Sequence, residues 1–499
     1  MREVFVEKTY EDQSVLVSGA TGFIGKVLVE KLLRDCKKLK NIYILLRSKK
    51  GDGLAKRFEN FKNSIVFNNV RKMDASIFDK LIPVEGDLME PKMGISESDE
   101  EHLAKNLNII IHCAASVRFD EPIRVALQLN TISTKNMLQL AEKCDNLKAF
   151  VHVSTAYSNT NQKVIFEKIY DPFIDYKLFL DLFEKNDNDE LEALCEKALE
   201  IFPNTYVLTK HLSEKLVSDF EHLPITIVRP SIVTPSNMEP EMGWVDSLNG
   251  PMGVLLGASS GILRTVHGNG DLTCDLIPCD FVANCVITAG ASIASSPTKS
   301  LEIYNCTSSQ QFHLTWNEFL DIGRNTYKQY PSTKVFWYPG GRMCANYYFY
   351  FLYFTLFQFI PACLIDICAV LAGKKRWAIK LQRRIFDSMK VFAYFLNNSW
   401  NWDAKNCQLL VQRLNVEERE KFNFDVSKLD FDKYVEHWVI GSRRFVMKLD
   451  DSTIPEAKRK FVFLFWLDVT VKSIFAMGFG YLLLRMYAGI SNKSVIKIS

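Results

Sequence analysis

The sequence predicts an α/β protein with a doubly wound parallel sheet, followed by an α-rich C-terminal domain and a hydrophobic tail segment. Three observations lead to this prediction. Short buried strands alternate with amphipathic helices through residue 153, which is the pattern of βαβ units. A glycine-rich turn joins the first of these strands to the first helix. Two long apolar stretches lie in the last third of the 499 residues, a length that suits two or three domains.

The composition argues against several classes of protein. A net charge of +3 gives no support to a nucleic-acid partner. The 12 cysteines lack the spacing of a metal site, so we expect reduced thiols in a cytosol-facing protein and no metal. The first residues (MREVFVEKTYEDQ) are charged and lack the apolar core of a secretory signal.

The stretch SVLVSGATGFIGKVLVEKLL, residues 14–33, reads as a buried strand, a tight turn and a helix. Its glycines are Gly19, Gly22 and Gly25. The first permits the sharp turn, the second lets backbone N–H groups approach a pyrophosphate, and the third lets the helix pack closely on the sheet. The helix then points its N-terminal amides and positive dipole end at the phosphate. A glycine turn without a ligand is the alternative, which the flanking strand and helix disfavour.

The end of the second predicted strand, residues 42–46, indicates which dinucleotide is bound. An acidic residue here would bind the 2′-hydroxyl of adenosine. This chain has Arg47, with Lys49 and Lys50 just behind it, and a cation suits a 2′-phosphate. We therefore expect NADPH rather than NADH, the alternative being a solvated basic loop. Asp87, at the end of the next strand, is placed to accept a hydrogen bond from the adenine amino group.

A later strand and helix supply a candidate catalytic group. The strand at residues 149–153 ends in Ser154 and Thr155, at the carboxyl edge of the sheet, where ligands bind in such folds. Tyr206 and Lys210 are four residues apart, on one face of a predicted helix. The phenol can give a proton to a carbonyl oxygen as hydride reaches the carbon. We expect the ammonium one turn away to lower the phenol pKa from about 10 toward neutrality.

The remaining roles follow from the same geometry. Either Thr155 or Ser154 would hold the carbonyl oxygen, and Lys210 would also hold the ribose hydroxyls of nicotinamide. The spacing Tyr-x-x-x-Lys is common by chance, and the alternative is an amphipathic surface helix. The order of glycine turn, hydroxyl at a strand end, Tyr-x-x-x-Lys and a further strand favours the catalytic interpretation.

With these residues in place, the chain resembles the extended short-chain dehydrogenase/reductases, and within them the fatty acyl-CoA reductases. The stretches that carry the resemblance are SGATGFIGKVLVEKLLR, YILLR, HCAASVRFD, VHVSTAYSN and NTYVLTKHLSEKL. A more specific segment, GWVDSLNGP at residues 243–251, is similar to one typical of this family. Residues 400–448 resemble the family's second domain, which is named after male sterility proteins. The resemblance covers nearly the whole chain.

The resemblance implies a Rossmann-type catalytic domain that reduces a long-chain fatty acyl-CoA to the alcohol with two NADPH. A hemithioacetal would expel CoA, and the aldehyde would then be reduced. Tyr206 would be the general acid, Lys210 its partner and Thr155 the orienting hydroxyl. Ser18, where the family usually has threonine, and Ser133, in place of a glycine, are departures that do not touch this chemistry. The implied cofactor-binding residues are Gly19, Thr21, Gly22, Phe23, Ile24, Gly25, Arg47, Asp87 and Lys210.

The apolar stretch at residues 347–371 is long enough to span a bilayer. Pro361 and Asp366 within it suit an interfacial or re-entrant hairpin better, and its aromatic density fits a membrane interface. The alternatives are a pair of buried core helices and the wall of an acyl tunnel. We expect contact with membrane lipid.

The second apolar stretch, residues 461–488, follows three basic residues. Asp468 and Lys472 can pair on one helix face, which lowers the cost of placing them in a membrane, and Arg485 can snorkel toward an interface. We expect a C-terminal anchor with the catalytic part in the cytosol, rather than a peripheral amphipathic helix. The endoplasmic reticulum is the expected membrane, with peroxisome and lipid droplet as alternatives.

These observations divide the chain into four predicted parts: an NADPH-binding catalytic domain at 1–335, with a substrate-binding part at about 235–335; a hydrophobic segment at 336–376; an α-helical domain at 377–457; and the anchor at 458–499. One alternative function is an extended short-chain dehydrogenase acting on a sterol-like or other apolar alcohol or ketone. Another is a non-catalytic NADPH-binding protein of lipid surfaces. The sequence indicates neither acyl chain length nor oligomeric state.

Overall fold

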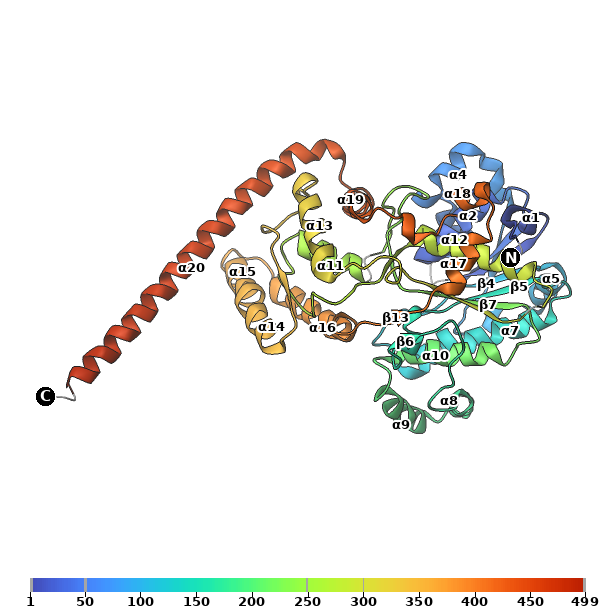
Figure 1. Cartoon of the computed structure of the whole chain (residues 1–499), viewed down its shortest axis with the longest axis horizontal. Helices are drawn as coiled ribbons and strands as arrows, with labels where there is room; N and C mark the ends of the chain where they lie inside the picture. The colour runs from blue at the N-terminus through green and yellow to red at the C-terminus, as the bar shows by residue number, and fades with distance from the viewer. Residues whose placement is uncertain (1–2, 49–51, 248–249, 299, 497–499) are drawn as a thin grey trace.

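A seven-stranded parallel sheet lies at the centre of the larger part of the molecule, in the order β11-β7-β5-β4-β1-β2-β3 (Figure 1). The computed structural model describes residues 3–48, 52–247, 250–298 and 300–496. The strand order runs outward from β1 in both directions, so the predicted doubly wound sheet is confirmed. The strands are β1 (Ser14–Ser18), β2 (Asn41–Leu46), β3 (Leu81–Glu85), β4 (Ile109–His112), β5 (Ala149–Val153), β7 (Ile225–Pro230) and β11 (Glu302–Cys306).

Helices cover both faces of this sheet. Val15 and Val17 of β1 pack into one core cluster, while Leu16 packs into the other, because successive strand residues point to opposite faces. Figure 1 shows α2 and α12 on one side of the strands and α7 and α10 on the other. The bounds of these helices are α2 (Phe23–Asp35), α12 (Cys279–Ala294), α7 (Ser133–Lys143) and α10 (Thr205–Ser218).

The helical segment between β4 and β5 consists of three consecutive elements. An α-helical start, α6 (Ile123–Leu127), is followed by a π-helical turn, η4 (Gln128–Ile132), and then by α7. A π turn inserts an extra residue into the helix and changes which side chains face the sheet edge. It places Asn130 toward the loop that follows β4.

Two helical insertions extend the sheet domain. Residues 51–80 hold α3 (Leu54–Lys62) and α4 (Asn68–Met73), and the buried Phe61 and Phe67 fix them to the core. The insertion at residues 160–200 forms α8 (Tyr176–Glu184) and α9 (Asn188–Leu199), which stand apart from the sheet (Figure 1).

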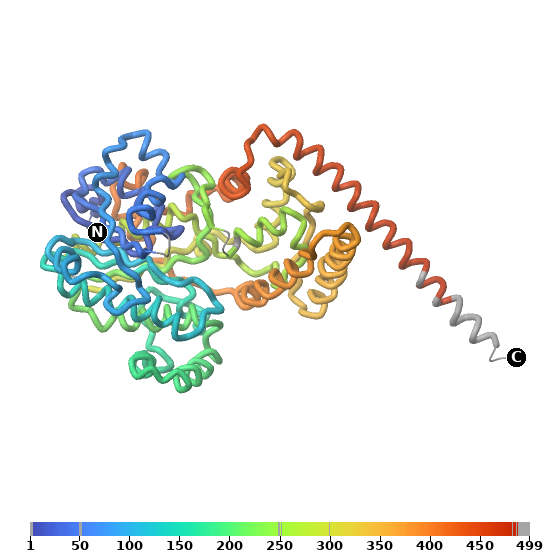
Figure 2. Tube along the Cα trace, turned by 180° about the vertical axis from the view of Figure 1, so that it is seen from behind, coloured from blue at the N-terminus to red at the C-terminus, as the bar shows by residue number. Residues whose placement is uncertain are grey.

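The C-terminal region is mostly helical and forms the other end of the molecule. Its last helix, α20 (Ile454–Ile496), extends far beyond the body, as both views show (Figures 1 and 2). Two segments are long and apolar enough to cross a membrane, Tyr347–Leu371 and Asp451–Arg485. The other elements at this end are α13 (Trp316–Gln329), α14 (Tyr347–Phe354), η6 (Thr355–Phe359), α15 (Ile360–Leu371), α16 (Ala378–Leu396) and α19 (Phe431–Gly441). Helices α17 (Lys405–Gln412) and α18 (Val416–Lys421) return to the sheet and lie beside α12 and α2 (Figure 1).

The two ends of the chain interlock. Trp438 of α19 is fully buried in the core cluster that contains Val15 of the central sheet. A short strand, β13 (Asn401–Trp402), pairs with β6 (Val164–Ile165) of the second insertion. Near the start of the chain, the Val4 backbone N–H donates to the carbonyl of Arg413 at 2.9 Å. One hydrophobic core therefore holds residues from both ends of the chain.

Candidate active site

The turn between β1 and α2 requires glycine at two of its positions. Gly19 has φ +72°, in the left-handed region, and a Cβ atom here would lie 2.7 Å from the Ala114 backbone nitrogen. A Cβ atom on Gly25 would lie 2.1 Å from the carbonyl oxygen of Gly19. The turn is therefore drawn tightly against the end of β4 and against the helix it begins.

The same turn leaves the start of α2 suited to an anion. The N-cap residue is Gly22, which has no side chain to accept hydrogen bonds from the first helical turn. Backbone N–H groups at a helix N-terminus and the positive end of its dipole bind phosphate. Phe23 stacks on Trp244 with ring centroids 5.4 Å apart, and Lys26 forms an ion pair with Asp246. The segment 243–246, picked out in the sequence, thus packs beside the glycine turn.

Arg47 and Asp87 lie together at the ends of β2 and β3. An Arg47 nitrogen is 3.7 Å from an Asp87 carboxylate oxygen, and the two side chains are 48% and 31% exposed. An ion pair this exposed contributes little, so a phosphate can replace the carboxylate as the partner of Arg47. Lys49 and Lys50 lie outside the described residues.

Thr155 and Ser154, at the end of β5, have different surroundings. The Ser154 hydroxyl donates to the buried carboxylate of Glu214 at 2.5 Å, and that carboxylate also pairs with Arg229 at 2.7 Å. The Thr155 hydroxyl instead accepts from the backbone N–H of Tyr157 at 3.3 Å and lies near enough to the phenol of Tyr206 to lower the pKa of that phenol. Of the two candidates, only Thr155 is therefore directed to the tyrosine.

Lys210 is buried one turn along α10 from Tyr206. Its ammonium donates to the Val153 carbonyl at the end of β5, at 2.8 Å. Burial lowers the pKa of Lys210 from 10.5 to about 8. Tyr206, Lys210 and Thr155, chosen from three motif positions in the sequence, thus meet at one edge of the sheet.

The sequence-based prediction for the pKa of Tyr206 was wrong. Burial raises the pKa of Tyr206 to about 12, and the neighbouring Thr155 hydroxyl offsets this only in part. Desolvation outweighs any effect of the ammonium at Lys210, because the ammonium is directed at a backbone carbonyl. The phenol consequently keeps its proton at neutral pH, which is the state that a proton donor requires.

Asn130, to which the sequence analysis gave no role, connects the site. Its side-chain oxygen accepts from the Ser116 N–H at 2.8 Å, and its amide donates to the Thr209 hydroxyl at 2.9 Å. It thereby ties the loop after β4 to α10, between Tyr206 and Lys210. The polar residue in mid-helix was the available signal, but only the π turn shows where it points.

An aromatic cluster closes the site from the C-terminal region. The ring of Phe119 stacks on Tyr206 with centroids 5.6 Å apart. Phe395 and Phe392, both on α16, lie 5.2 and 5.9 Å from Phe119 in the same measure. Phe395 also contacts Tyr157, two residues after Thr155, at 5.3 Å. Helix α16 therefore brings an apolar wall directly to the tyrosine.

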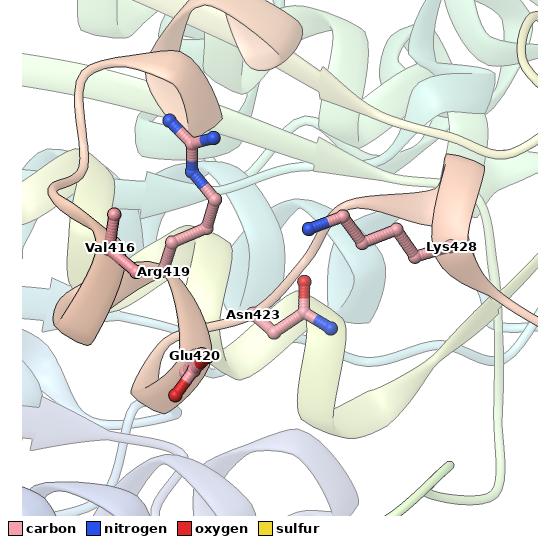
Figure 3. Close-up of a pocket in the computed structure, with 5 residues that line it drawn as sticks. All are labelled: Val416, Arg419, Glu420, Asn423 and Lys428. Carbon is pink, nitrogen blue, oxygen red and sulfur yellow. The ribbon is translucent and has the colours of Figure 1, made fainter.

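A separate surface hollow of about 360 Å³ lies at α18 and is lined by Val416, Arg419, Glu420, Asn423 and Lys428 (Figure 3). None of the sequence-predicted site residues lines it. We assign it no role in the site built around Tyr206.

Comparison with known proteins decides the family. Two family models match, both described as male sterility protein, one an NAD-binding domain over residues 17–286 and the other over residues 357–449. Fatty acyl-CoA reductase 1 of Rattus norvegicus is 36% identical over 457 residues, covering 91% of this chain and 89% of that protein. The human protein of the same name has the same identity and coverage. Fatty acyl-CoA reductase 2 of Bos taurus is 36% identical over 451 residues, covering 90% and 88%.

This chain belongs to the fatty acyl-CoA reductase family.

Solved structures support the fold of this family member. The terminal R domain from a myxalamid PKS-NRPS pathway superposes with a TM-score of 0.56 at 18% identity, covering 87% of this chain and 91% of that one. A reductase domain of a nonribosomal peptide synthetase from Mycobacterium tuberculosis also gives 0.56 at 18% identity, covering 88% and 95%. At this identity the likeness concerns the fold alone.

Proposed function

We propose that the protein is an alcohol-forming, NADPH-dependent fatty acyl-CoA reductase of an intracellular membrane. The observation that carries the proposal is the meeting of Tyr206, Thr155 and Lys210 beside a glycine turn built for a pyrophosphate. The curated relatives named fatty acyl-CoA reductase match this chain over about nine tenths of its length. That name favours an acyl-CoA thioester over the sterol-like substrate of the alternative function.

The residues present fit a nicotinamide dinucleotide. Gly19 and Gly25 leave a cradle that a Cβ atom would fill, and the first turn of α2 offers backbone N–H groups to the pyrophosphate. We propose that Thr21, Phe23 and Ile24 contribute backbone contacts there, that Arg47 holds the 2′-phosphate, and that Asp87 contacts adenine. When bound, the cofactor supplies hydride.

The chain's own groups would then handle the proton. The Thr155 hydroxyl and the Tyr206 phenol both face the position of a carbonyl oxygen, and Tyr206 donates its proton there as hydride arrives at the carbonyl carbon. The first reduction turns the thioester into a hemithioacetal, whose C–S bond breaks to give an aldehyde and the CoA thiol. The second hydride and proton turn the aldehyde into the alcohol, so that each alcohol consumes two NADPH and two protons.

The ammonium of Lys210 has a supporting role in this scheme. It is already held by the Val153 carbonyl at the strand end, so it needs little reorganisation to bind the ribose hydroxyls. The aromatic cluster of Phe119, Phe392 and Phe395 excludes water from the phenol and offers an apolar surface for the acyl chain next to its thioester.

Helix α20 is the proposed membrane anchor. The predicted pair of Asp468 and Lys472 is present, and Asp468 also pairs with Arg264 of the body at 3.3 Å. Since Asp468 is held by the body, we place the start of the embedded part after Lys472. Residues 473–496 rise about 36 Å as a helix, enough for a hydrocarbon core of about 30 Å. The catalytic part would then face the cytosol.

The test is turnover by the full-length protein in membranes, with acyl-CoAs of graded length. We expect fatty alcohol, one CoA thiol released and two NADPH consumed per alcohol. Tyr206→Phe should lower kcat by about 10²–10⁴-fold while NADPH binding is kept. Tyr170→Phe, whose half-buried hydroxyl accepts from the Phe166 N–H outside the site, should change neither. NADPH binding without release of CoA from any thioester would overturn the proposal and favour one of the two alternative functions.

A further inference from the structure

The apolar helix 347–371, made of α14, η6 and α15, lies lengthwise on the body. Its buried positions are spaced by four residues and form one stripe. The remaining faces are not covered. A helix that crosses a bilayer by itself would be surrounded by lipid, so it would not have one side buried against the body of the protein along its length. The stripe consists of Tyr350, Phe354, Gln358, Ala362 and Asp366.

The polar members of this stripe bind the body directly. The Gln358 side-chain oxygen accepts from the backbone N–H groups of Arg264 and Thr265, the latter at 3.2 Å. The Asp366 carboxylate accepts from three N–H groups in the first turn of α16, at 2.9, 2.9 and 3.1 Å. Moving this helix away to span a membrane would leave both polar groups in hydrocarbon without these partners, which is expensive.

The other faces of the helix are exposed and almost entirely apolar. Leu371 is 83% exposed and Tyr348 is 82% exposed. A continuous apolar surface of this length exceeds what soluble proteins leave open to water. Its further members are Tyr347, Phe349, Phe351, Leu352, Leu356, Phe357, Ile360, Leu364, Ile365, Ile367 and Val370.

A cluster of exposed cations follows this surface directly. Six basic side chains lie within eleven residues after α15, in the turn and on the first half of α16. Clusters of this size beside an apolar segment bind anionic lipid headgroups. The members of this basic cluster are Lys374, Lys375, Arg376, Lys380, Arg383 and Arg384.

The position of α20 indicates that the same end of the molecule faces the membrane. The free part of α20 leaves the body at the end where α14 and α15 lie, opposite the end formed by the central sheet, and both views agree on this (Figures 1 and 2). Exposed apolar residues already occur on α20 at Val462, Phe463 and Trp466, and they continue beyond the pair of Asp468 and Lys472 with Ile474 and Phe475. One bilayer can therefore meet both apolar segments at this end of the molecule.

We propose that the apolar helix 347–371 lies in the plane of one leaflet of a bilayer that contains anionic phospholipid, with the basic cluster on the headgroup phosphates. The helix then does not span. From this surface α16 runs back to Phe392 and Phe395 at the active site, which gives an acyl chain a route from the leaflet to Tyr206. The inference extends the proposed membrane association, and its test reads chemical labelling instead of turnover, so the two proposals can fail separately.

The first experiment adds one cysteine at one or the other end of the helix and counts labelling above that of the Cys368→Ser parent, because Cys113, Cys144 and Cys363 are partly exposed. Full-length protein carrying Cys368→Ser and either Ala345→Cys or Lys375→Cys is reconstituted into sealed vesicles of phosphatidylcholine with one fifth phosphatidylserine. A separate variant, Asp189→Cys on the exposed α9, reports the fraction of molecules whose body lies on the outside of the vesicles. We expect a membrane-impermeant maleimide to label both end positions from outside. Labelling of only one end until the vesicles are opened would show a spanning helix and overturn the proposal.

The second experiment uses the exposed native Cys368 on α15. We expect lipid to protect it from the maleimide in these vesicles and detergent to remove the protection. Labelling at the same rate in both conditions would show that the helix does not enter the leaflet. Replacing Arg383 and Arg384 by Gln should speed Cys368 labelling at least about tenfold, as should omitting phosphatidylserine. The matched pair Lys56→Gln and Lys72→Gln, in the first insertion, should not. Equal effects of the two pairs would overturn the assignment of the headgroup contact.

Discussion

The backbones of Gly243 and Gly441 touch, and this contact joins the segment beside the glycine turn to α19 of the C-terminal region. A Cβ atom on Gly441 would lie 1.9 Å from the carbonyl oxygen of Gly243. A Cβ atom on Gly243 would lie 1.9 Å from the carbonyl oxygen of His437, and Gly243 also has φ +69°. Two main chains approach here as closely as they can, 198 positions apart in the chain.

Gly441→Ala should therefore destabilise the fold by about 1–3 kcal/mol through overpacking. Gly243→Ala should destabilise the fold by about 1–2 kcal/mol more than overpacking alone, because alanine would have to adopt the left-handed backbone conformation of Gly243. The measurement is Tm by scanning calorimetry. Gly250→Ala separates the two terms, because Gly250 has φ +60° but a Cβ atom added there would meet nothing within 4 Å. If all three variants had the same Tm, the close contact between Gly243 and α19 would make no contribution to stability.

Thr155→Ala and Ser154→Ala should have different profiles. Thr155→Ala removes the hydroxyl beside Tyr206, so kcat should fall by about 10²-fold. It also removes the acceptor of the Tyr157 N–H, a capping contact worth about 0.5–2 kcal/mol, so Tm should fall modestly. Ser154→Ala removes a hydrogen bond to the buried Glu214 carboxylate, worth about 1.5–3 kcal/mol, so Tm should fall while kcat of the folded protein changes little. The reverse pattern would move the carbonyl-orienting role to Ser154.

Arg47→Gln should raise KM for NADPH by about 10–100-fold, the value of one charge-assisted hydrogen bond, and leave KM for NADH unchanged. Initial rates with both cofactors check this. Lys56→Gln, a nearby exposed cation on α3, serves as the control for a general loss of charge. Equal losses with NADPH and NADH would mean that Arg47 does not bind the 2′-phosphate.

The activity should fall on the alkaline side of a pH profile. Burial lowers the pKa of Lys210 to about 8, so the ammonium is present below pH 8 and is lost as the pH rises through that value. Because the ammonium holds the ribose hydroxyls in the proposed scheme, kcat/KM for NADPH should decline above about pH 8. A profile that stays level to about pH 10 would contradict this role.

Phe395→Ala should change the choice among acyl chains. The substitution removes the side chain that joins α16 to Phe119 and Tyr157, and one pocket contact of this kind changes discrimination by about 10–200-fold. The measurement is the ratio of kcat/KM for a long and a medium acyl-CoA. Phe386→Ala, on the same helix but packed against Tyr350 and Phe354, is the matched control and should leave the ratio unchanged.

Short sequence patterns correctly predicted the features that depend only on residues close together in the chain. Mainly apolar runs such as 149–153 became strands that are buried on both faces, and the glycine turn followed from backbone geometry at Gly19 and Gly25. The pair of Asp468 and Lys472 could be predicted because four residues make one helical turn.

Other features depend on distant segments and left no local signal. Phe395 meets Phe119 only after the whole chain has folded, and Arg264 reaches Asp468 from 204 positions away. The pKa of Tyr206 was wrong because spacing reveals a neighbouring charge but not the burial that outweighs it. The three predicted boundaries between the four parts remain a prediction, and residues on both sides of residue 335 share one core cluster.

The bridge between Val4 and Leu414 has a consequence for how the protein is made. During synthesis from the N-terminus, the central strands can assemble early, but α1 (Val6–Tyr10) keeps part of its surroundings open until the ribosome has passed residue 418, which receives the Glu7 N–H at 3.0 Å. For most of translation the nascent chain therefore exposes the apolar surface around α1 that α18 later covers, which is called the seam here. Chaperones should bind this seam, and release should coincide with the emergence of α18.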